Sequence, residues 1–171
     1  MISQILKYNL SGIDSQDIGH KMIRQSNDTD IVRFLSCCYE EMDFASNGFD
    51  FDGQSVIKTI NMSSENGGCF FEEFKRGELV GLFAAMIAPN IMDHNQNRGV
   101  EFIWHSLPSL GKKTRIQIMD KLLSSGIYWA AENNIWLSVN TSVMAPGAGR
   151  ILERNGFKET EKVFVRSKSW V

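Results

Sequence analysis

Apolar residues recur at helical spacing in two stretches of the chain. In the first stretch they are Ile31, Phe34, Leu35 and Cys38, and in the second they are Ile116, Met119, Leu122, Leu123, Ile127, Ala130 and Ala131. Spacings of three and four residues place such side chains on one face of a helix. The pattern predicts a helix over 28–42, with N-cap candidates in Ser26-Asn27-Asp28, and a long helix over 114–133. A shorter helix is predicted over 54–62.

β-rich segments fill the middle of the chain. Cys69 to Lys75 and Leu79 to Ala88 flank the short turn Arg76-Gly77-Glu78, which predicts a β-hairpin. We expect 89–98 to be a polar loop and 99–105 to extend the same sheet as an antiparallel strand.

The C-terminal part of the chain completes the predicted sheet. The nearly all-apolar segment 135–139 is typical of a strand buried on both faces. Pro146 suits the first turn of a last helix that stops at Gly156. A strand over 20–25 and a closing strand pair over 157–166 complete a mixed sheet.

The turn before the long helix carries the clearest candidate chemistry. Thr114-Arg115-Ile116-Gln117 matches a capping box, so we expect the helix to begin at Arg115. Gly111, Lys112 and Lys113 come just before it. Free backbone N–H groups, the positive helix end and these cations suit an anion such as a pyrophosphate. In the alternative interpretation, Gly111 only turns the chain and the lysines are solvated.

Composition limits the class of protein. The 171 residues are 43% hydrophobic and 22% charged, which fits one globular domain over 1–171 with 1–19 as an N-terminal extension. The net charge of -2 arises from intermixed signs and gives no global reason to expect nucleic acid or an anionic membrane as a partner. No apolar run approaches the roughly 20 residues of a membrane span, and the N-terminus lacks a basic start, so we expect a cytoplasmic protein.

Metal and thiol chemistry have little support in the sequence. Cys37, Cys38 and Cys69 form no CxxC pair, and His20, His94 and His105 lack ligand spacing. We expect the cysteines to be small buried residues and the protein to hold no metal.

The order of these elements resembles the GCN5-related N-acetyltransferase (GNAT) superfamily over roughly 20–166. Gly77-Glu78-Leu79-Val80-Gly81 is similar to the hairpin that begins the family's third strand, Leu137-Ser138-Val139 to its fifth strand, and 150–157 to its closing helix with a Gly-Phe end. The resemblance implies an α+β fold with α/β/α layers, in which about four helices flank a mixed, mainly antiparallel sheet.

The resemblance also implies acetyl-CoA as the co-substrate. In that family the turn and helix start hold the pyrophosphate, and the fourth strand diverges from the fifth to admit the pantetheine arm. The matching residues here are Ile103, Trp104 and His105 on the strand, Gly111, Lys112, Lys113, Thr114, Arg115 and Ile116 at the helix start, and Asn140 beyond the fifth strand.

Glu101 and His105 are the candidate general bases. Strand alternation places both on one side of 99–105, near the position that the resemblance gives the acetyl group. A buried Glu101 with a raised pKa, or a neutral His105, would accept an amine proton near pH 7. In the alternative interpretation, Glu101 pairs with a surface lysine and His105 ends the strand in water.

Two functions therefore remain open. The first is N-acetyl transfer to a primary amine of a small molecule or protein, by a monomer or homodimer, with the acceptor pocket built from 43–53, the second helix and 89–98. The second is a GNAT-like fold that has lost catalysis and binds or inhibits a protein, of the kind that a virus encodes. Lys112, Lys113 and Thr114 in place of spaced glycines, and Leu152 where many members have a catalytic Tyr, favour the second. A nucleotide-binding protein is disfavoured because the chain lacks a full Walker or GxGxxG pattern.

Overall fold

The computed structural model describes residues 24–41, 50–90, 93–140 and 147–159. In chain order these residues form α1 (Asp28–Glu41), α2 (Gly53–Glu65), β1 (Cys69–Lys75), β2 (Glu78–Asn90), β3 (Asp93–Ser106), α3 (Lys112–Glu132), β4 (Trp136–Ser138) and α4 (Ala148–Arg154). None of the helices in these ranges is long and apolar enough to cross a membrane.

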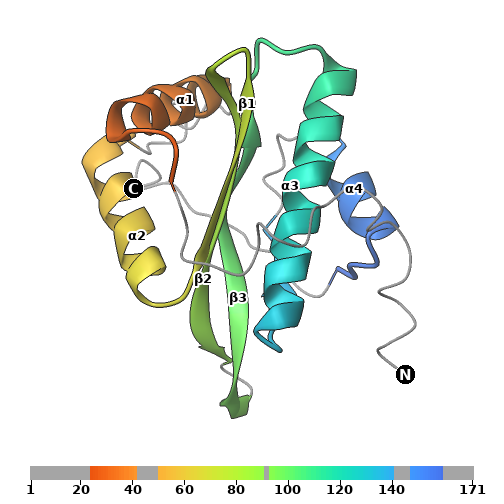
Figure 1. The fold of residues 1–171 in the computed structure, drawn as a ribbon. Helices are drawn as coiled ribbons and strands as arrows, with labels where there is room; N and C mark the ends of the chain where they lie inside the picture. The colour runs from red at the N-terminus through yellow and green to blue at the C-terminus, as the bar shows by residue number, and fades with distance from the viewer. Residues whose placement is uncertain (1–23, 42–49, 91–92, 141–146, 160–171) are drawn as a thin grey trace, which may run out of the picture.

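The described strands form one mixed sheet in the order β1-β2-β3-β4. β1 pairs with β2, and β2 with β3, in antiparallel fashion, whereas β3 and β4 run parallel. Figure 1 shows α1 and α2 on one side of the sheet and α3 on the other, with α4 beside α3. The predicted α+β fold with α/β/α layers is confirmed.

Side-chain caps fix the starts of the first two helices. The side chain of Asn27 accepts a hydrogen bond from the Asp30 N–H at 2.9 Å, and Asp52 accepts one from the Gln54 N–H at 3.0 Å. α1 therefore matches its predicted range closely. α2 begins at Gly53 and continues past its predicted end to Glu65.

The predicted hairpin forms between β1 and β2. Arg76 and Gly77 both have positive φ, at 54° and 79°, which is the conformation of a two-residue type I′ turn. Such a turn matches the twist of the strands it joins.

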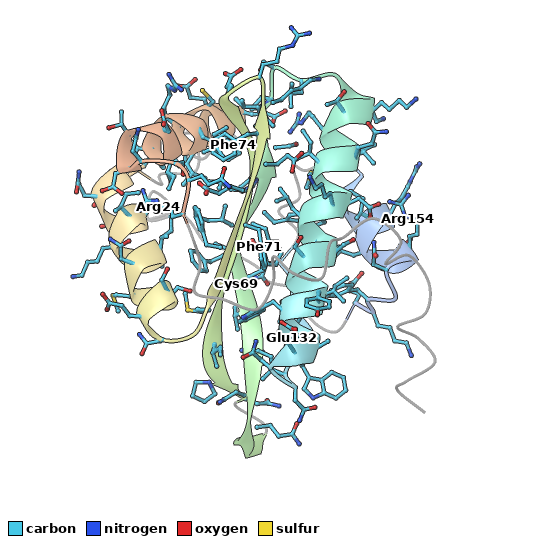
Figure 2. All side chains as sticks on the ribbon, viewed as in Figure 1. Arg24, Cys69, Phe71, Phe74, Glu132 and Arg154 are labelled. Atoms are coloured by element: carbon cyan, nitrogen blue, oxygen red, sulfur yellow. The ribbon has the colours of Figure 1, made fainter. Side chains whose placement is uncertain are left out.

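The core between α3 and the sheet is closely packed. Phe83 is completely buried, and a Cβ built on Gly126 of α3 would lie 2.5 Å from its ring. The ring of Phe71, labelled in Figure 2, lies 6.3 Å from that of Phe83, centroid to centroid. The indole N–H of Trp104 donates to the Met119 carbonyl at 2.9 Å and so ties β3 to α3.

The prediction of a loop over 89–98 is wrong. β2 continues to Asn90, β3 begins at Asp93, and Pro89 lies opposite Asn97. Cys69, the first residue of β1, lies opposite Ala85, so the part of β2 beyond Ala85 has β3 as its one neighbour among the described strands. A strand with a free side tolerates polar residues and a proline, because one row of backbone groups needs no strand partner.

The predicted capping box is also wrong. α3 begins at Lys112, and its N-cap is Gly111, which makes no side-chain cap hydrogen bond. The Gly111 carbonyl accepts a hydrogen bond from the Arg115 N–H at 3.1 Å. Thr114 therefore lies within the first turn of the helix and is not its N-cap.

The C-terminal elements agree only partly with the predictions. β4 is not buried on both faces within the described residues, because Trp136 is 72% exposed. α4 stops as predicted: Gly156 has a φ of 82°, and the Phe157 N–H donates to the Leu152 carbonyl at 3.0 Å. Residues 157–159 form no strand. The rest of the closing pair, most of the predicted strand 20–25, and Pro146 lie outside the described residues.

Candidate functional site

β3 and β4 pair over a short ladder and then separate. The ladder joins Arg98 to Trp136, Gly99 to Leu137 and Val100 to Ser138, and it includes no described residue beyond these. β3 continues to Ser106, still paired with β2. The β4-facing edge of β3 is therefore without a strand partner from Glu101 onward among the described residues. We call this part of the sheet the strand split.

Glu101 occupies the start of the strand split. Its side chain is buried, with 6% exposure, and Oε2 accepts the backbone N–H of Asn140 at 3.1 Å. Burial raises the pKa of Glu101 to about 7, although the hydrogen bond from Asn140 opposes the shift. A carboxyl group with this pKa exchanges a proton readily at neutral pH.

A β-bulge separates Glu101 from the rest of the strand. Ile103 lies opposite Ala84, and Glu101 opposite Ala85, so Phe102 is the extra residue. The uninterrupted alternation that placed Glu101 and His105 on one side is therefore absent.

A cavity of about 260 Å³ lies between β3 and the helices α1 and α2. It is mainly apolar with a few polar groups, and its described lining residues are Leu35, Cys38, Tyr39, Phe51, Ser55, Val56, Thr59, Phe102, Ile103 and His105. Glu101 is not among them. Of the two candidate bases, His105 therefore lines the cavity and Glu101 lies at the strand split.

His105 is held in its neutral form. The pKa of His105 is lowered to about 4, chiefly by burial and also by the charge of Arg115, while the charge of Glu41 opposes the shift. At neutral pH the imidazole carries no charge and has one donor and one acceptor nitrogen.

Arg115 makes a bidentate ion pair across the layers. Its Nη1 and Nη2 lie 2.6 and 2.7 Å from the two carboxylate oxygens of Glu41, and its Nε donates to the Ser106 hydroxyl at 3.3 Å. The guanidinium, predicted from the resemblance to bind phosphate, is engaged by α1 in this structure. Sequence reasoning missed Glu41 because its partner lies 74 positions away and no local motif links them.

The other predicted phosphate residues lie around the start of α3. Gly111, Lys112 and Lys113 are exposed, and a Cβ on Gly111 would meet no atom within 4 Å. The backbone N–H groups of 112–114 precede the first helical hydrogen bond, which is donated by Arg115. Thr114 is half-buried, and Ile116 packs against the core. This end of α3 therefore presents amides and two lysines to an anion.

The remaining predicted cofactor residues lie on both sides of the split. Ile103 and Trp104 are buried in β3, and Asn140 is exposed just beyond β4. The structure therefore brings Asn140 to Glu101.

Sequence reasoning located only part of the cavity lining. Phe51 and the residues contributed by α2 fall inside the predicted acceptor region, whereas none of the described lining comes from 89–98. Leu35 and Cys38 of α1 were assigned only to the core, and Tyr39 was missed. Its ring lies 5.4 Å from that of Phe51. The one sequence signal for Tyr39 was that an aromatic residue directly follows Cys38, the last residue of the apolar stripe of the first helix.

The cysteines are unsuited to nucleophilic catalysis. Burial raises the pKa of the Cys38 and Cys69 thiols to about 12, so both are protonated at neutral pH. Both side chains are buried as predicted, whereas Cys37, also predicted to be buried, is only half-buried. Within the described ranges, no three His, Cys, Asp or Glu side chains are grouped closely enough to hold a metal ion.

No protein-family model matches this sequence, and neither does any curated protein. Solved structures do match the fold. A transcriptional regulator from Bacillus halodurans superimposes with a TM-score of 0.64 at 15% identity, over 86% of this chain and 99% of that one. An aminoglycoside acetyltransferase from an uncultured soil metagenomic sample gives 0.60 at 10% identity, over 85% and 91%.

A predicted acetyltransferase from Clostridium acetobutylicum, solved with acetyl-CoA, superimposes with a TM-score of 0.54 at 16% identity, over 84% of this chain and 94% of that one. Identities this low establish architecture rather than activity. The likenesses agree with the observed order of helices and strands. The chain therefore has the GNAT fold.

Proposed function

We propose that this protein is an acetyl-CoA-dependent N-acetyltransferase that acts on a primary amine of a small molecule. The observation that carries the proposal is the buried carboxyl group of Glu101 at the strand split, with a pKa of about 7. Solved structures with the same fold include acetyltransferases, one of them with acetyl-CoA. Aminoglycoside acetyltransferases among them support a small-molecule acceptor.

The residues around the split suit acetyl-CoA. When bound, acetyl-CoA supplies an acyl group activated as a thioester. The amides of 112–114 and the side chains of Lys112 and Lys113 would hold its pyrophosphate, and the free edge of β3 would hold its pantetheine arm. Arg115 joins them only if it exchanges Glu41 for a phosphate oxygen.

In the proposed reaction, Glu101 accepts the proton that the amine loses when its nitrogen attacks the thioester carbon. The new N–C bond forms, the C–S bond breaks, and the proton leaves with the CoA sulfur. A backbone N–H on β3 polarises the thioester carbonyl, and no covalent bond to the protein is required. Many GNAT members have a proton-donating Tyr at the position that Leu152 of α4 takes in this chain. Water or Glu101 must therefore return the proton to the CoA sulfur.

Glu101 is a better general base than His105. A base works best when its pKa lies near the working pH, because it must be ionised and still hold a proton well. Glu101, with a pKa of about 7, meets this condition, whereas His105, with a pKa of about 4, is a weak base. We assign proton transfer to Glu101 and a lining role to His105.

Mass spectrometry of the products tests the proposal. The protein is incubated with acetyl-CoA and a panel of primary amines, and acetylated amine is measured together with free CoA thiol. The proposal expects both products in equal amounts and a rate at least about 100-fold lower in Glu101→Gln. Absence of product with every amine, in protein confirmed to be folded, would overturn it.

A second candidate is a GNAT-like fold that binds a protein without catalysis. The ion pair between Arg115 and Glu41 favours it, because the guanidinium is then not free to bind a phosphate. The buried Leu152 favours it too, because a leucine side chain cannot donate a proton. Absence of binding of both acetyl-CoA and CoA would favour this candidate.

A further inference from the structure

The cavity lies against β3, the strand that carries the proposed general base Glu101. Phe102, Ile103 and His105 line it, and all three follow Val100, the last β3 residue paired with β4. The same stretch of β3 has its free edge toward the strand split. A molecule in the cavity would therefore lie against the strand assigned to the acyl donor.

The cavity is small. Its volume of about 260 Å³ is below the roughly 300–1,000 Å³ typical of sites for drug-sized ligands. A compact amine with one ring fills such a volume, whereas an aminoglycoside with several sugar rings would extend beyond it. Leu35, Val56 and Ile103 contribute apolar surface to it.

The described lining carries no charge at neutral pH. It contains no carboxylate and no lysine or arginine. Burial keeps the Cys38 thiol protonated by raising its pKa, and the pKa of His105 is low enough to keep it neutral. The nearby Glu41 carboxylate is already paired with Arg115. The exposed Asp52 carboxylate accepts a hydrogen bond from the Ser55 hydroxyl of the lining. A polycation that loses its hydration deeper among the described lining residues would gain no counter-ion there, which is costly.

Two lining hydroxyls are left as acceptors. The Ser55 hydroxyl donates to Asp52, and the Thr59 hydroxyl donates to the Ser55 carbonyl at 2.9 Å. Each has one proton to donate, so what remains for a ligand is an oxygen lone pair. Such oxygens suit an N–H group, which a primary amine provides.

We propose that this cavity binds the acceptor and that the acceptor is a small apolar primary amine, such as an arylalkylamine, rather than a polycation. This inference rests on the proposed acetyl transfer. The amine nitrogen forms its bond to the acyl carbon as the C–S bond breaks. Because Glu101 does not line the cavity, the proton passes through water to Glu101 and from there to the CoA sulfur.

Substrate competition tests the inference. Acetyl transfer to phenethylamine, spermidine and kanamycin is measured separately, and we expect kcat/KM for phenethylamine to exceed the others by about tenfold or more. Thr59→Phe would place a ring in the cavity and lower kcat/KM for phenethylamine by about tenfold or more, mainly through KM. Lys58→Phe adds the same ring at an exposed position of α2 and should leave kcat/KM unchanged.

The two proposals fail in different ways. Efficient transfer to kanamycin or spermidine but not to phenethylamine would overturn the inference and leave acetyl transfer intact. Equal effects of Thr59→Phe and Lys58→Phe, in variants whose melting temperature acetyl-CoA still raises, would also overturn it. Absence of transfer to any amine, together with no melting shift by acetyl-CoA, would overturn the proposed function and this inference with it.

Discussion

Glu101 is a buried acid whose described polar contact is one backbone amide, that of Asn140. Because its pKa is about 7, the ionised fraction needed for proton abstraction grows as pH rises through neutrality. We therefore expect kcat at saturating amine to increase with pH and to level off above about 7, as measured by initial rates of CoA release. An inflection near pH 4 instead would point to His105, whose pKa is about 4.

The same group links stability to pH. The folded pKa of Glu101, about 7, lies above the ordinary value of 4.5, so between these values the folded state keeps a proton that the unfolded state has lost. The free energy of unfolding should therefore fall as pH rises through this window.

Glu101→Gln removes that titration. Relative to wild type, the variant should gain on the order of 3 kcal/mol in free energy of unfolding between pH 4.5 and 7. Urea unfolding at several pH values measures the difference. Parallel pH profiles for the two proteins would show that Glu101 titrates normally.

Single residues were predictable where a pattern or the family resemblance pointed to them. Glu101 was singled out as a buried acid before the structure placed it at the strand split. Glu41 was not, because its ion pair joins α1 to α3 and depends on tertiary packing. The bulge at Phe102 arises from pairing with β2, which strand alternation does not encode.

Among the elements, α3 depends on close approach to the sheet. Gly126→Ala would place a Cβ 2.5 Å from the buried ring of Phe83, and such overpacking should lower the free energy of unfolding by about 1–3 kcal/mol. Gly149→Ala in α4 is the matched control, since its Cβ would meet nothing within 4 Å. It should stabilise by about 0.5–1 kcal/mol through helix propensity. Equal effects of the two changes in urea unfolding would contradict this packing.

The start of α3 is the element proposed to bind pyrophosphate. Replacing Lys112 and Lys113 together by Ala should weaken acetyl-CoA binding by about tenfold at low ionic strength, because two charges near a helix N-terminus are lost. Titration calorimetry measures the change. Lys58→Ala, at an exposed position of α2, is the charge-matched control for a single lysine. Unchanged affinity in the double variant would remove these lysines from the site.

Elements were predictable where periodicity and turn chemistry agreed. α1 and the β1–β2 hairpin followed from apolar spacing and a Gly-containing turn. The pairing between the end of β2 and the start of β3 was not predicted, because the polar residues there pair with each other outside the core. The N-cap of α3 was predicted at Thr114 and lies at Gly111. More than one local pattern in the sequence could start this helix, and the turn after β3 determines which residue does.

At the scale of the whole molecule, the order of elements carried more information than any motif. It indicated the GNAT fold although the solved structures share only 10–18% identity with the chain. The acceptor did not follow from that order, because cavity size and charge depend on which side chains α1 and α2 place against β3.

Thermal melting with acetyl-CoA, CoA and a control anion at matched ionic strength measures whether the protein binds acyl-CoA specifically. If the strand split and the start of α3 bind acyl-CoA, both CoA species at about 100 times their dissociation constants should stabilise the fold by roughly 2.7 kcal/mol, and the control anion should not. No shift with either CoA species, or an equal shift with the control anion, would show that these parts of the fold do not form an acyl-CoA site.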